Sequence, residues 1–375
     1  MREYLVVFTV AAAVTYLLAT ASRVAAERVG AVAKVRDRDV HATPVPYFGG
    51  LAMLGGLAAA LLVAHRLPFL STAGDVAYDD AVAVLAGGAV ICLVGVLDDL
   101  FELDALLKLG GQLVAAAVVV VLGVQFLNLP LPNALGGTLL LDPTQGPLLT
   151  VLVIVTTVNA VNFVDGLDGL AAGVVTIGAV AFFLYAYLLA VENNLTVAIA
   201  AALLMSGLAG ACAGFLPHNF FPARMFMGDS GSMLIGLVLA CGAITLSGQF
   251  PPGAITEGLF GARAGTHPVL LPLLLPVAML LVPFVDLLLA VVRRTRAGRS
   301  PFSPDKQHLH HRLLEIGHSH LRTVLLMYAV AGLVSFGAVV MSLFGGWRSV
   351  LGVSVLGAAT AVAVFWLPRG RGPTV

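Results

Sequence analysis

Apolar residues occur along this chain in long runs, separated by short connections that hold most of the polar residues. A helix needs roughly 20 apolar residues to cross the hydrocarbon core of a bilayer. The pattern therefore predicts an all-α integral membrane protein with about eleven transmembrane helices in a single domain over residues 1–375. The expected spans are 4–22, 48–64, 81–97, 109–126, 148–164, 169–190, 195–215, 230–248, 269–292, 323–344 and 349–367.

The first apolar run also fits a secretory signal peptide, because it ends in the small residues Ala19, Thr20 and Ala21. A positively charged segment stays on the cytoplasmic side, away from signal peptidase. Basic residues follow this run at once: Arg23, Arg28, Lys34, Arg36 and Arg38. We therefore expect residues 4–22 to be retained as a transmembrane helix.

The charged residues are distributed unequally between the two sides of the expected bundle. Most Lys and Arg lie in the connections after odd-numbered spans and in the C-terminal tail; the other side holds Arg2, Arg66, Arg263 and Arg348. The positive-inside rule then places the N-terminus outside and the C-terminus in the cytoplasm. Acids contribute little to orientation, yet the cytoplasmic side holds Asp98, Asp99, Glu102, Asp104, Asp165, Asp168, Asp229, Asp305 and Glu315. Their presence there points to chemistry on that face.

Composition supports the membrane assignment and removes other classes. Hydrophobic residues make up 59% of the chain and charged residues only 11%, against about 25% charged in a soluble domain. The formal net charge is zero, which gives no electrostatic basis for binding nucleic acid. Cys92, Cys212 and Cys241 lack CxxC spacing, so they are expected to pack in apolar surroundings rather than to bind metal or form disulfides.

Two adjacent aspartates, Asp98 and Asp99, follow the third expected span. Neighbouring carboxylates repel each other and are costly to desolvate at a membrane edge, unless a cation lies beside them. They are therefore candidate metal ligands. The alternative is a polar helix end that faces water.

The fifth expected span ends in a pattern of amides and acids. At 100° per residue, Asn159, Asn162 and Asp165 share one face of a helix. Amides inside a membrane usually face the bundle interior or a wet cavity. Gly166 allows a tight turn that would present both Asp165 and Asp168 at the rim. The alternative is a glycine-rich loop that only caps two helices.

The connection before the eighth expected span combines an aromatic residue with a helix start. Asp229 and Ser230 suit the cap of the following helix. A helix N-terminus flanked by small residues is also a place where backbone N–H groups bind phosphate. Phe226 lies close by in the sequence and is a candidate to stack on a nucleotide base.

The ninth connection is the most basic and the richest in histidine. It contains Arg293, Arg294, Arg296, Arg299, Lys306, His308, His310, His311 and Arg312, followed by His318 and His320. Several imidazoles together admit a zinc site, whereas His and Arg donors suit a pyrophosphate. Part of the arginine run also suits anionic lipid headgroups.

Together these motifs resemble the polyprenyl-phosphate N-acetylhexosamine-1-phosphate transferase superfamily (glycosyltransferase 4 family), which includes the MraY translocases and the WecA/TagO initiators of envelope polymers. The resemblance runs from residues 41–50 to His311 and rests on four motifs in order: DD, NxxNxxDGxDGL, FMGDxGS and HxHH. It implies an enzyme of the bacterial cytoplasmic membrane, with its active site on the cytoplasmic face. Dimers occur in the family, so a homodimer is expected from the resemblance.

The resemblance assigns the acids to metal binding and catalysis. Asp98 and Asp99 match the paired aspartates that handle the metal or activate the lipid phosphate. Asp229 matches the magnesium-binding aspartate, and Asp165 the aspartate after the two asparagines. These four are the candidate ligands of Mg²⁺ or Mn²⁺; Asp98, Asp99, Asp165 and Asp168 are also the acidic catalytic candidates.

The other motif residues are candidates for binding substrate. By resemblance, Phe226 stacks on uracil, Asn219 contacts the nucleotide, and Lys108 is the basic residue that follows the DD motif. The HxHHR loop is implicated in pyrophosphate and sugar recognition. The substrate-binding candidates are Asn159, Asn162, Asn219, Phe226, Lys108 and Arg312, and the catalytic candidates in the HxHHR loop are His308, His310 and His311.

The histidine loop also separates the branches of the superfamily. The stretch from Asp305 to Arg312 resembles the WecA/TagO branch, whereas MraY enzymes have HHH followed by an acid. This favours UDP-N-acetylglucosamine (UDP-GlcNAc) over the muramyl-pentapeptide nucleotide. The implied reaction transfers N-acetylglucosamine 1-phosphate to an undecaprenyl or decaprenyl phosphate, releases UMP and initiates a cell-envelope glycopolymer. It proceeds by direct attack or through a phospho-aspartate.

Two departures from the family pattern affect residues near the motifs. Tyr47 and Phe48 stand before the paired glycines, where many relatives place an arginine. Glu102 and Asp104 alter the usual DDxxD spacing.

Two alternatives to this function stay open. An MraY-type phospho-MurNAc-pentapeptide translocase would differ in the UDP-sugar that it consumes. A secondary transporter of an anionic solute is favoured by polar groups within spans, namely Asn159, Asn162 and Asp286. However, transport sites usually lie at the midplane between repeated halves, whereas these acids gather at one edge.

Overall fold

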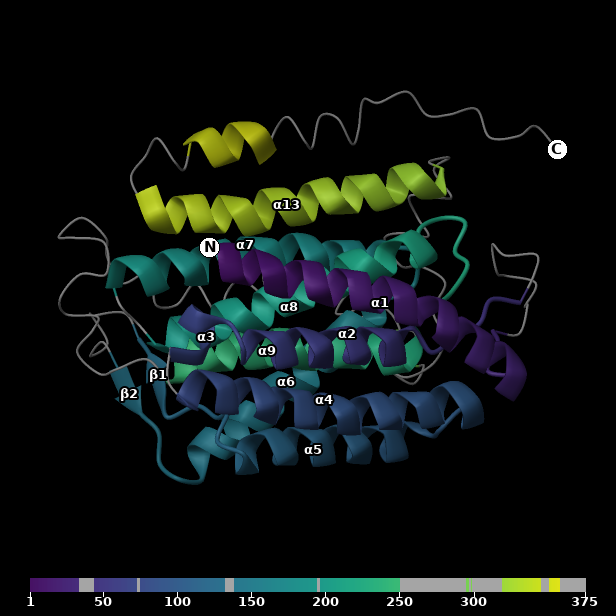
Figure 1. Cartoon of the computed structure of the whole chain (residues 1–375), viewed down its shortest axis with the longest axis horizontal. Coiled ribbons are helices and arrows are strands. Elements are labelled where there is room, and N and C mark those ends of the chain that lie inside the picture. Colours follow the sequence, from purple (N-terminus) through teal and green to yellow (C-terminus); the bar gives the residue numbers. More distant parts are fainter. Residues whose placement is uncertain are drawn as a thin grey trace.

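Long helices packed side by side make up the described part of the molecule (Figure 1). The computed structural model describes residues 1–33, 44–72, 75–131, 138–193, 196–249, 295–296, 298, 319–344 and 351–357. The helices are α1 (Arg2–Val29), α2 (Gly49–Ala64), α3 (Pro68–Thr72), α4 (Asp75–Phe101), α5 (Ala105–Val121), α6 (Gln145–Val164), α7 (Leu170–Asn193), α8 (Thr196–Asn219), α9 (Gly228–Gly248) and α13 (His320–Phe344).

Within these residues, 7 helices are long and apolar enough to cross a membrane: α1, α4, α6, α7, α8, α9 and α13. The shorter apolar helices α2 and α5 coincide with two further predicted spans. The expected span 269–292 lies outside the described residues, and only 351–357 of the span 349–367 is described, as helix. The chain is therefore a multi-pass helical membrane protein.

Helix α9 occupies the centre of the bundle and contacts α4, α6 and α8 (Figure 1). Every residue from Ser230 to Gly248 is buried, as is typical of a helix that is apolar on all sides. Small residues allow close approach: a Cβ at Gly236 would come 2.8 Å from the Val158 backbone of α6. The first turn of α9, with Asp229, is consequently surrounded by other helices.

Helix α1 is packed into the bundle against α2 and α8. Its Glu3 carboxylate accepts hydrogen bonds of 2.9 Å from the backbone N–H groups of Phe69 and Leu70 in α3. The hydroxyl of Ser206 in α8 donates to the Tyr4 carbonyl at 2.6 Å. These contacts fix the N-terminal end of α1 to α3 and α8. The C-terminal end of α1 lies at the opposite end of the bundle (Figure 1).

A two-stranded antiparallel ladder joins α5 to α6, which the all-α prediction did not include. Strand β1 (Asn128–Pro130) pairs with β2 (Thr138–Leu140). The ladder is extended by a bond from Leu141 N–H to the Leu127 carbonyl, and Leu127 N–H donates to Gly248 at the end of α9. The described part of this connection is thus paired within itself and with the end of α9.

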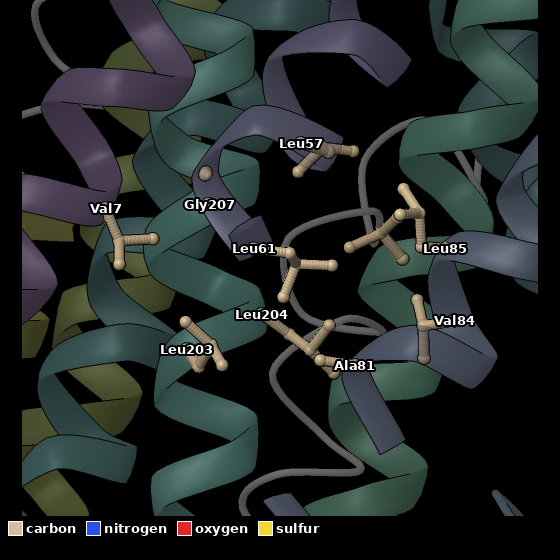
Figure 2. Close-up of a pocket in the computed structure, with 11 residues that line it drawn as sticks. Val7, Leu57, Leu61, Ala81, Val84, Leu85, Leu203, Leu204 and Gly207 are labelled. Carbon is tan, nitrogen blue, oxygen red and sulfur yellow. The ribbon is translucent and has the colours of Figure 1, made fainter. Parts of the chain in front are cut away.

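A small apolar pocket of about 20 Å³ lies among α1, α2, α4, α8 and α9 (Figure 2). Leu57 and Leu61 of α2 face Leu203 and Leu204 of α8 across it, and Ala81 of α4 lies at its edge. Along α4, Ala81 is about 25 Å from the DD motif at 1.5 Å per residue. The pocket is therefore separate from the polar cluster described next.

Candidate active site

Four helix ends meet at one end of the bundle and carry most of the predicted site residues (Figure 1). Asp98 and Asp99 lie in the last turn of α4, which continues to Phe101 instead of ending before them as predicted. Lys108 lies in the first turn of α5, Asp165 directly follows α6, and Asp229 is the second residue of α9. Because neighbouring helices run antiparallel, these ends come together.

Asp99 binds the N-terminus of α9 with both carboxylate oxygens. Its Oδ1 accepts from the Asp229 N–H (2.9 Å), and its Oδ2 accepts from the Ser230 hydroxyl (3.0 Å) and N–H (3.4 Å). Gly95 permits this approach, because a Cβ there would overlap the Ser230 backbone. The helix N-terminus that was predicted to bind phosphate, or to be capped by its own Asp229 and Ser230, is instead capped by Asp99 from another helix.

Lys108 bridges two of the predicted acids. Its Nζ lies 3.3 Å from Asp98 Oδ2 and forms a second ion pair with Asp229 Oδ2. The three side chains are only 16–24% exposed, so their attraction is screened less than at an open surface. The predicted basic residue after the DD motif is thus part of the acidic cluster and neutralises some of its charge.

Asn162 orients Asp229 from the side of α6. Its Nδ2 donates to Asp229 Oδ1 and to Ser232 Oγ, both at 2.8 Å. Together with Lys108 on Oδ2, this bond fixes both oxygens of the Asp229 carboxylate. Of the predicted face of Asn159, Asn162 and Asp165, Asn162 therefore contacts α9 directly.

Asn159, one turn earlier on α6, contacts α5 instead. Its amide exchanges hydrogen bonds with Gln112, of 2.7 and 3.4 Å, and donates to the Val155 carbonyl. Gln112 is 1% exposed and was missed in the sequence. The signal that identified Asn159, an amide within an apolar run, applies equally to Gln112.

Asp165 has a carboxylate that accepts no hydrogen bond from any of the described residues, although it is half-buried. Burial, together with the nearby charges of Asp99 and Asp168, raises its pKa to about 7. A nearby cation would stabilise the ionised form of such a carboxylate, which is half-buried and has no hydrogen-bond donor among the described residues. Asp165 is therefore the acid of the cluster whose oxygens remain available to a ligand.

Asp168 and Asn219 join the turn after α6 to the loop before α9. Asp168 is 6% exposed and accepts the Ala223 N–H at 2.9 Å. Asn219 is 2% exposed; its Oδ1 accepts the Gly169 N–H at 3.0 Å and its Nδ2 donates to the Met225 carbonyl at 3.1 Å. The structure thus gives these predicted catalytic and nucleotide-binding residues backbone partners on both sides of the site.

Phe226 lies at the same end of the bundle and is half-buried. Its ring centroid is 6.1 Å from that of Tyr47, and its N–H donates to the Pro46 carbonyl at 2.9 Å. The segment before α2 is therefore paired with the loop before α9. Tyr47 adds a second aromatic ring beside the predicted base-stacking residue.

The donor set suits Mg²⁺, which prefers oxygen ligands and is usually held by one or two carboxylates together with substrate phosphates. Asp165 offers free oxygens, and Asp98 and Asp229 lie around the Lys108 ammonium. In the part of the chain that the structure describes, no three His, Cys, Asp or Glu side chains form a group that could hold a metal by themselves. The site therefore fits an ion that takes part of its ligand shell from the substrate.

The HxHHR loop, with His308, His310, His311 and Arg312, lies outside the described residues, as does the alternative zinc site built on it. His320, which follows this loop in the sequence, is described. It begins α13 and stacks on Phe221, with ring centroids 4.4 Å apart. The start of α13 therefore lies against the loop before α9.

Comparison with known proteins gives consistent matches over this chain. The family described as glycosyl transferase family 4 matches residues 81–247, which include the DD, NxxNxxD and FMGD motifs. The decaprenyl-phosphate N-acetylglucosaminephosphotransferase of Mycobacterium tuberculosis is 49% identical over 97% of this chain and 88% of its own length. The protein of the same name from Mycolicibacterium smegmatis is 48% identical over 99% of this chain and 90% of its own.

A more distant match has a related name. The probable undecaprenyl-phosphate N-acetylglucosaminyl 1-phosphate transferase of Bacillus subtilis is 31% identical over 95% of this chain and 90% of its own length. The similarity therefore extends through the whole bundle and is not confined to the motifs.

Proposed function

The chain belongs to glycosyl transferase family 4, and from this membership we propose that it transfers N-acetylglucosamine 1-phosphate from UDP-GlcNAc to a polyprenyl phosphate, with release of UMP. The observation that carries the proposal is the cluster in which Lys108 joins Asp98 and Asp229 at one end of an apolar bundle. A polyprenyl phosphate in the membrane would present its phosphate group at this end of the bundle. The names of the two mycobacterial relatives favour decaprenyl phosphate as the acceptor.

The reaction joins two phosphates and needs little proton transfer. An oxygen of the lipid phosphate attacks the β-phosphorus of UDP-GlcNAc, and the bond from this phosphorus to the bridging oxygen breaks, so that UMP leaves with that oxygen. A phosphate monoester has a second pKa near 6 and is mostly dianionic at neutral pH. We therefore assign Asp98 to orienting the nucleophile through Lys108, rather than to removing a proton.

Charge neutralisation dominates catalysis of such a step. Lys108 forms ion pairs with Asp98 and Asp229, and we assign it to neutralising the phosphate oxygens of the substrate. Asp165 and Asp229, the latter oriented by Asn162, would hold Mg²⁺. Held there, a divalent ion would supply positive charge that offsets the negative charge developing on the phosphate oxygens. Phe226 and Tyr47 are assigned to the uracil end of the nucleotide.

The orientation in the membrane follows from the distribution of charge. Arg23 and Arg28 near the end of α1, and Arg224 before α9, lie at the same end of the bundle as the DD motif. By the positive-inside rule this end faces the cytoplasm, which is where UDP-sugars are made. The proposed arrangement is a bacterial cytoplasmic-membrane enzyme with an external N-terminus and about eleven spans.

The test is a transfer assay with the purified protein in detergent. Mg²⁺, decaprenyl phosphate and UDP-GlcNAc labelled in the sugar should yield labelled lipid-linked GlcNAc-diphosphate and an equal amount of UMP, and EDTA should stop both. Transfer only from UDP-MurNAc-pentapeptide would place the protein in the MraY branch. No transfer from either nucleotide, with either prenyl phosphate, would contradict the proposal.

A further inference from the structure

Tyr328 of α13 reaches the turn that carries the site acids. Its hydroxyl donates a hydrogen bond of 2.5 Å to the carbonyl oxygen of Gly169, at the junction of that turn with α7. The same carbonyl also accepts the N–H of Gly173 at 3.0 Å. A carbonyl oxygen has two lone pairs, so both are used.

Helix α7 is shaped to admit this tyrosine. A Cβ placed on Gly173 would overlap the ring and hydroxyl of Tyr328. Gly173 lies one helical turn after Gly169, so the ring passes over the glycine face of α7 to reach the carbonyl. The absence of a side chain at Gly173 therefore lets Tyr328 of α13 approach the start of α7 and the turn before it.

Gly169 is the point at which several parts of the site are joined. Its φ of 75° is a left-handed conformation that a glycine adopts without strain. Its N–H donates to Asn219, which in turn bonds to the Met225 carbonyl just before Phe226. The residue before it, Asp168, is bound to the loop as well, so both sides of the turn are tied to the loop before α9.

Asp165 lies at the other end of this turn. The turn is held at Gly169 by Tyr328 from one side and by Asn219 from the other. The Asp165 carboxylate itself has no hydrogen-bond donor among the described residues. Its position is consequently set by the backbone of the turn rather than by bonds to its own oxygens.

We propose that Tyr328 is a positioning residue for the transfer reaction, and that its bond to Gly169 holds the 165–169 turn so that Asp165 faces the cluster of Asp98, Lys108 and Asp229. This proposal rests on the proposed function. Tyr328 lies in α13, a helix that contains none of the four motifs, so the proposal extends the site beyond the motif residues. Tyr328 acts through Gly169 and does not touch the reacting groups.

The decisive variant is Tyr328→Phe, which removes the hydroxyl and keeps the ring against Gly173. Its matched control is Tyr4→Phe, because Tyr4 is a buried tyrosine in α1 whose hydroxyl has no hydrogen-bond partner in the described structure. Both variants lose one tyrosine hydroxyl, from the buried ring of Tyr4 or the half-buried ring of Tyr328, but only Tyr328→Phe loses a bond to the site turn.

The first measurement uses metal-free protein without substrate. Hydrogen exchange of the peptide that covers 165–170 is followed by mass spectrometry, since the Gly169 N–H is itself bonded to Asn219. Tyr328→Phe should speed exchange in this peptide by about fivefold to tenfold, the effect of losing one net hydrogen bond. Tyr4→Phe should leave exchange in this peptide unchanged. Unchanged exchange in both variants would overturn the proposal.

The second measurement is the transfer assay as a function of Mg²⁺ concentration. Tyr328→Phe should lower kcat about tenfold and raise the Mg²⁺ concentration at half-maximal rate, with the KM for UDP-GlcNAc and the thermal midpoint close to wild type. A residue that only stabilises the fold would lower the midpoint and leave the Mg²⁺ requirement of the folded fraction unchanged, which would contradict positioning. If wild-type protein itself shows no transfer, the proposed function fails, while the exchange measurement still tests the bond.

Discussion

Asn162 and Asp229 are joined across the interface of α6 and α9 by a hydrogen bond of 2.8 Å from Nδ2 to Oδ1. The second hydrogen of the same amide is donated to Ser232 Oγ, so Asn162 cannot rotate without losing a bond. Lys108 holds the other oxygen of Asp229. The orientation of this carboxylate is therefore set by α5 and α6 together, although it lies on α9.

Asn162→Ala should weaken catalysis, because it removes the hydrogen bond that orients the Asp229 carboxylate. Loss of a bond that orients a metal-binding carboxylate typically costs about 10- to 100-fold in metal affinity or activity. We expect kcat to fall by this amount and the Mg²⁺ concentration for half-maximal rate to rise, measured by release of UMP. A variant with wild-type kcat and Mg²⁺ dependence would show that Asp229 needs no orientation by Asn162.

Asp229→Ala should have a larger effect. It removes the acid that lies between Asn162 and Lys108. Of the two ion pairs that Lys108 forms, only the one with Asp98 then remains. We expect no turnover above background even at saturating Mg²⁺, with UDP-GlcNAc binding retained when measured by calorimetry. Near-normal rates at high Mg²⁺ would exclude Asp229 as a ligand of the ion.

Several of these relationships were predictable from the sequence, because helical periodicity controls them. Periodicity places Asn159, Asn162 and Asp165 on one face of a helix, and the structure shows that Asn162 on this face contacts Asp229 of α9. The gathering of charged residues at one end of apolar spans likewise predicted which helix ends meet. Nine expected spans correspond to described helices: the 7 long ones together with α2 and α5.

Other features depend on contacts between distant segments, which periodicity does not specify. Asp99 caps the N-terminus of α9 instead of facing water, because Gly95 lets α4 pack against the backbone of Ser230. The pairing of Gln112 with Asn159 requires knowing that α5 lies beside α6. Tyr328 lies in an apolar span without any motif, so only its contact with Gly169 reveals it.

Asp165→Asn should inactivate the enzyme and yet stabilise the metal-free protein above neutral pH. In the folded protein the pKa of Asp165 is about 7, against 3.8 for an ordinary aspartate. The folded state thus binds the proton more tightly than the unfolded chain, and ionisation of this group costs stability. The cost is absent below about pH 4, grows as pH rises towards 7, and is complete above the folded-state pKa.

An asparagine cannot ionise, so the substitution removes this cost. In EDTA at pH 8, Asp165→Asn should therefore melt a few degrees higher than wild type, and the difference should shrink as the pH is lowered to 5. Thermal melts of the purified variants in detergent give the comparison. A lower midpoint at pH 8 would mean that the Asp165 carboxylate is stabilised in the metal-free fold.

Gly95→Ala should separate α4 from α9 and so affect both stability and activity. The added Cβ would overlap the Ser230 backbone, which cannot move aside as a flexible side chain could. Overpacking of this kind costs about 1–3 kcal/mol. It would also pull Asp99 away from the Asp229 and Ser230 N–H groups that it caps. We expect a lower thermal midpoint and a loss of transfer activity greater than the loss of folded protein.

Gly110→Ala is the matched control for this substitution. Gly110 also lies within a helix at the site end of the bundle, in α5, but a Cβ there meets nothing within 4 Å. Replacing an unobstructed helix glycine with alanine stabilises a helix by about 0.5–1 kcal/mol, so this variant should melt at or slightly above the wild-type temperature and keep its activity. If Gly95→Ala behaves like Gly110→Ala, then close contact between α4 and α9 is not what holds the Asp99 cap in place.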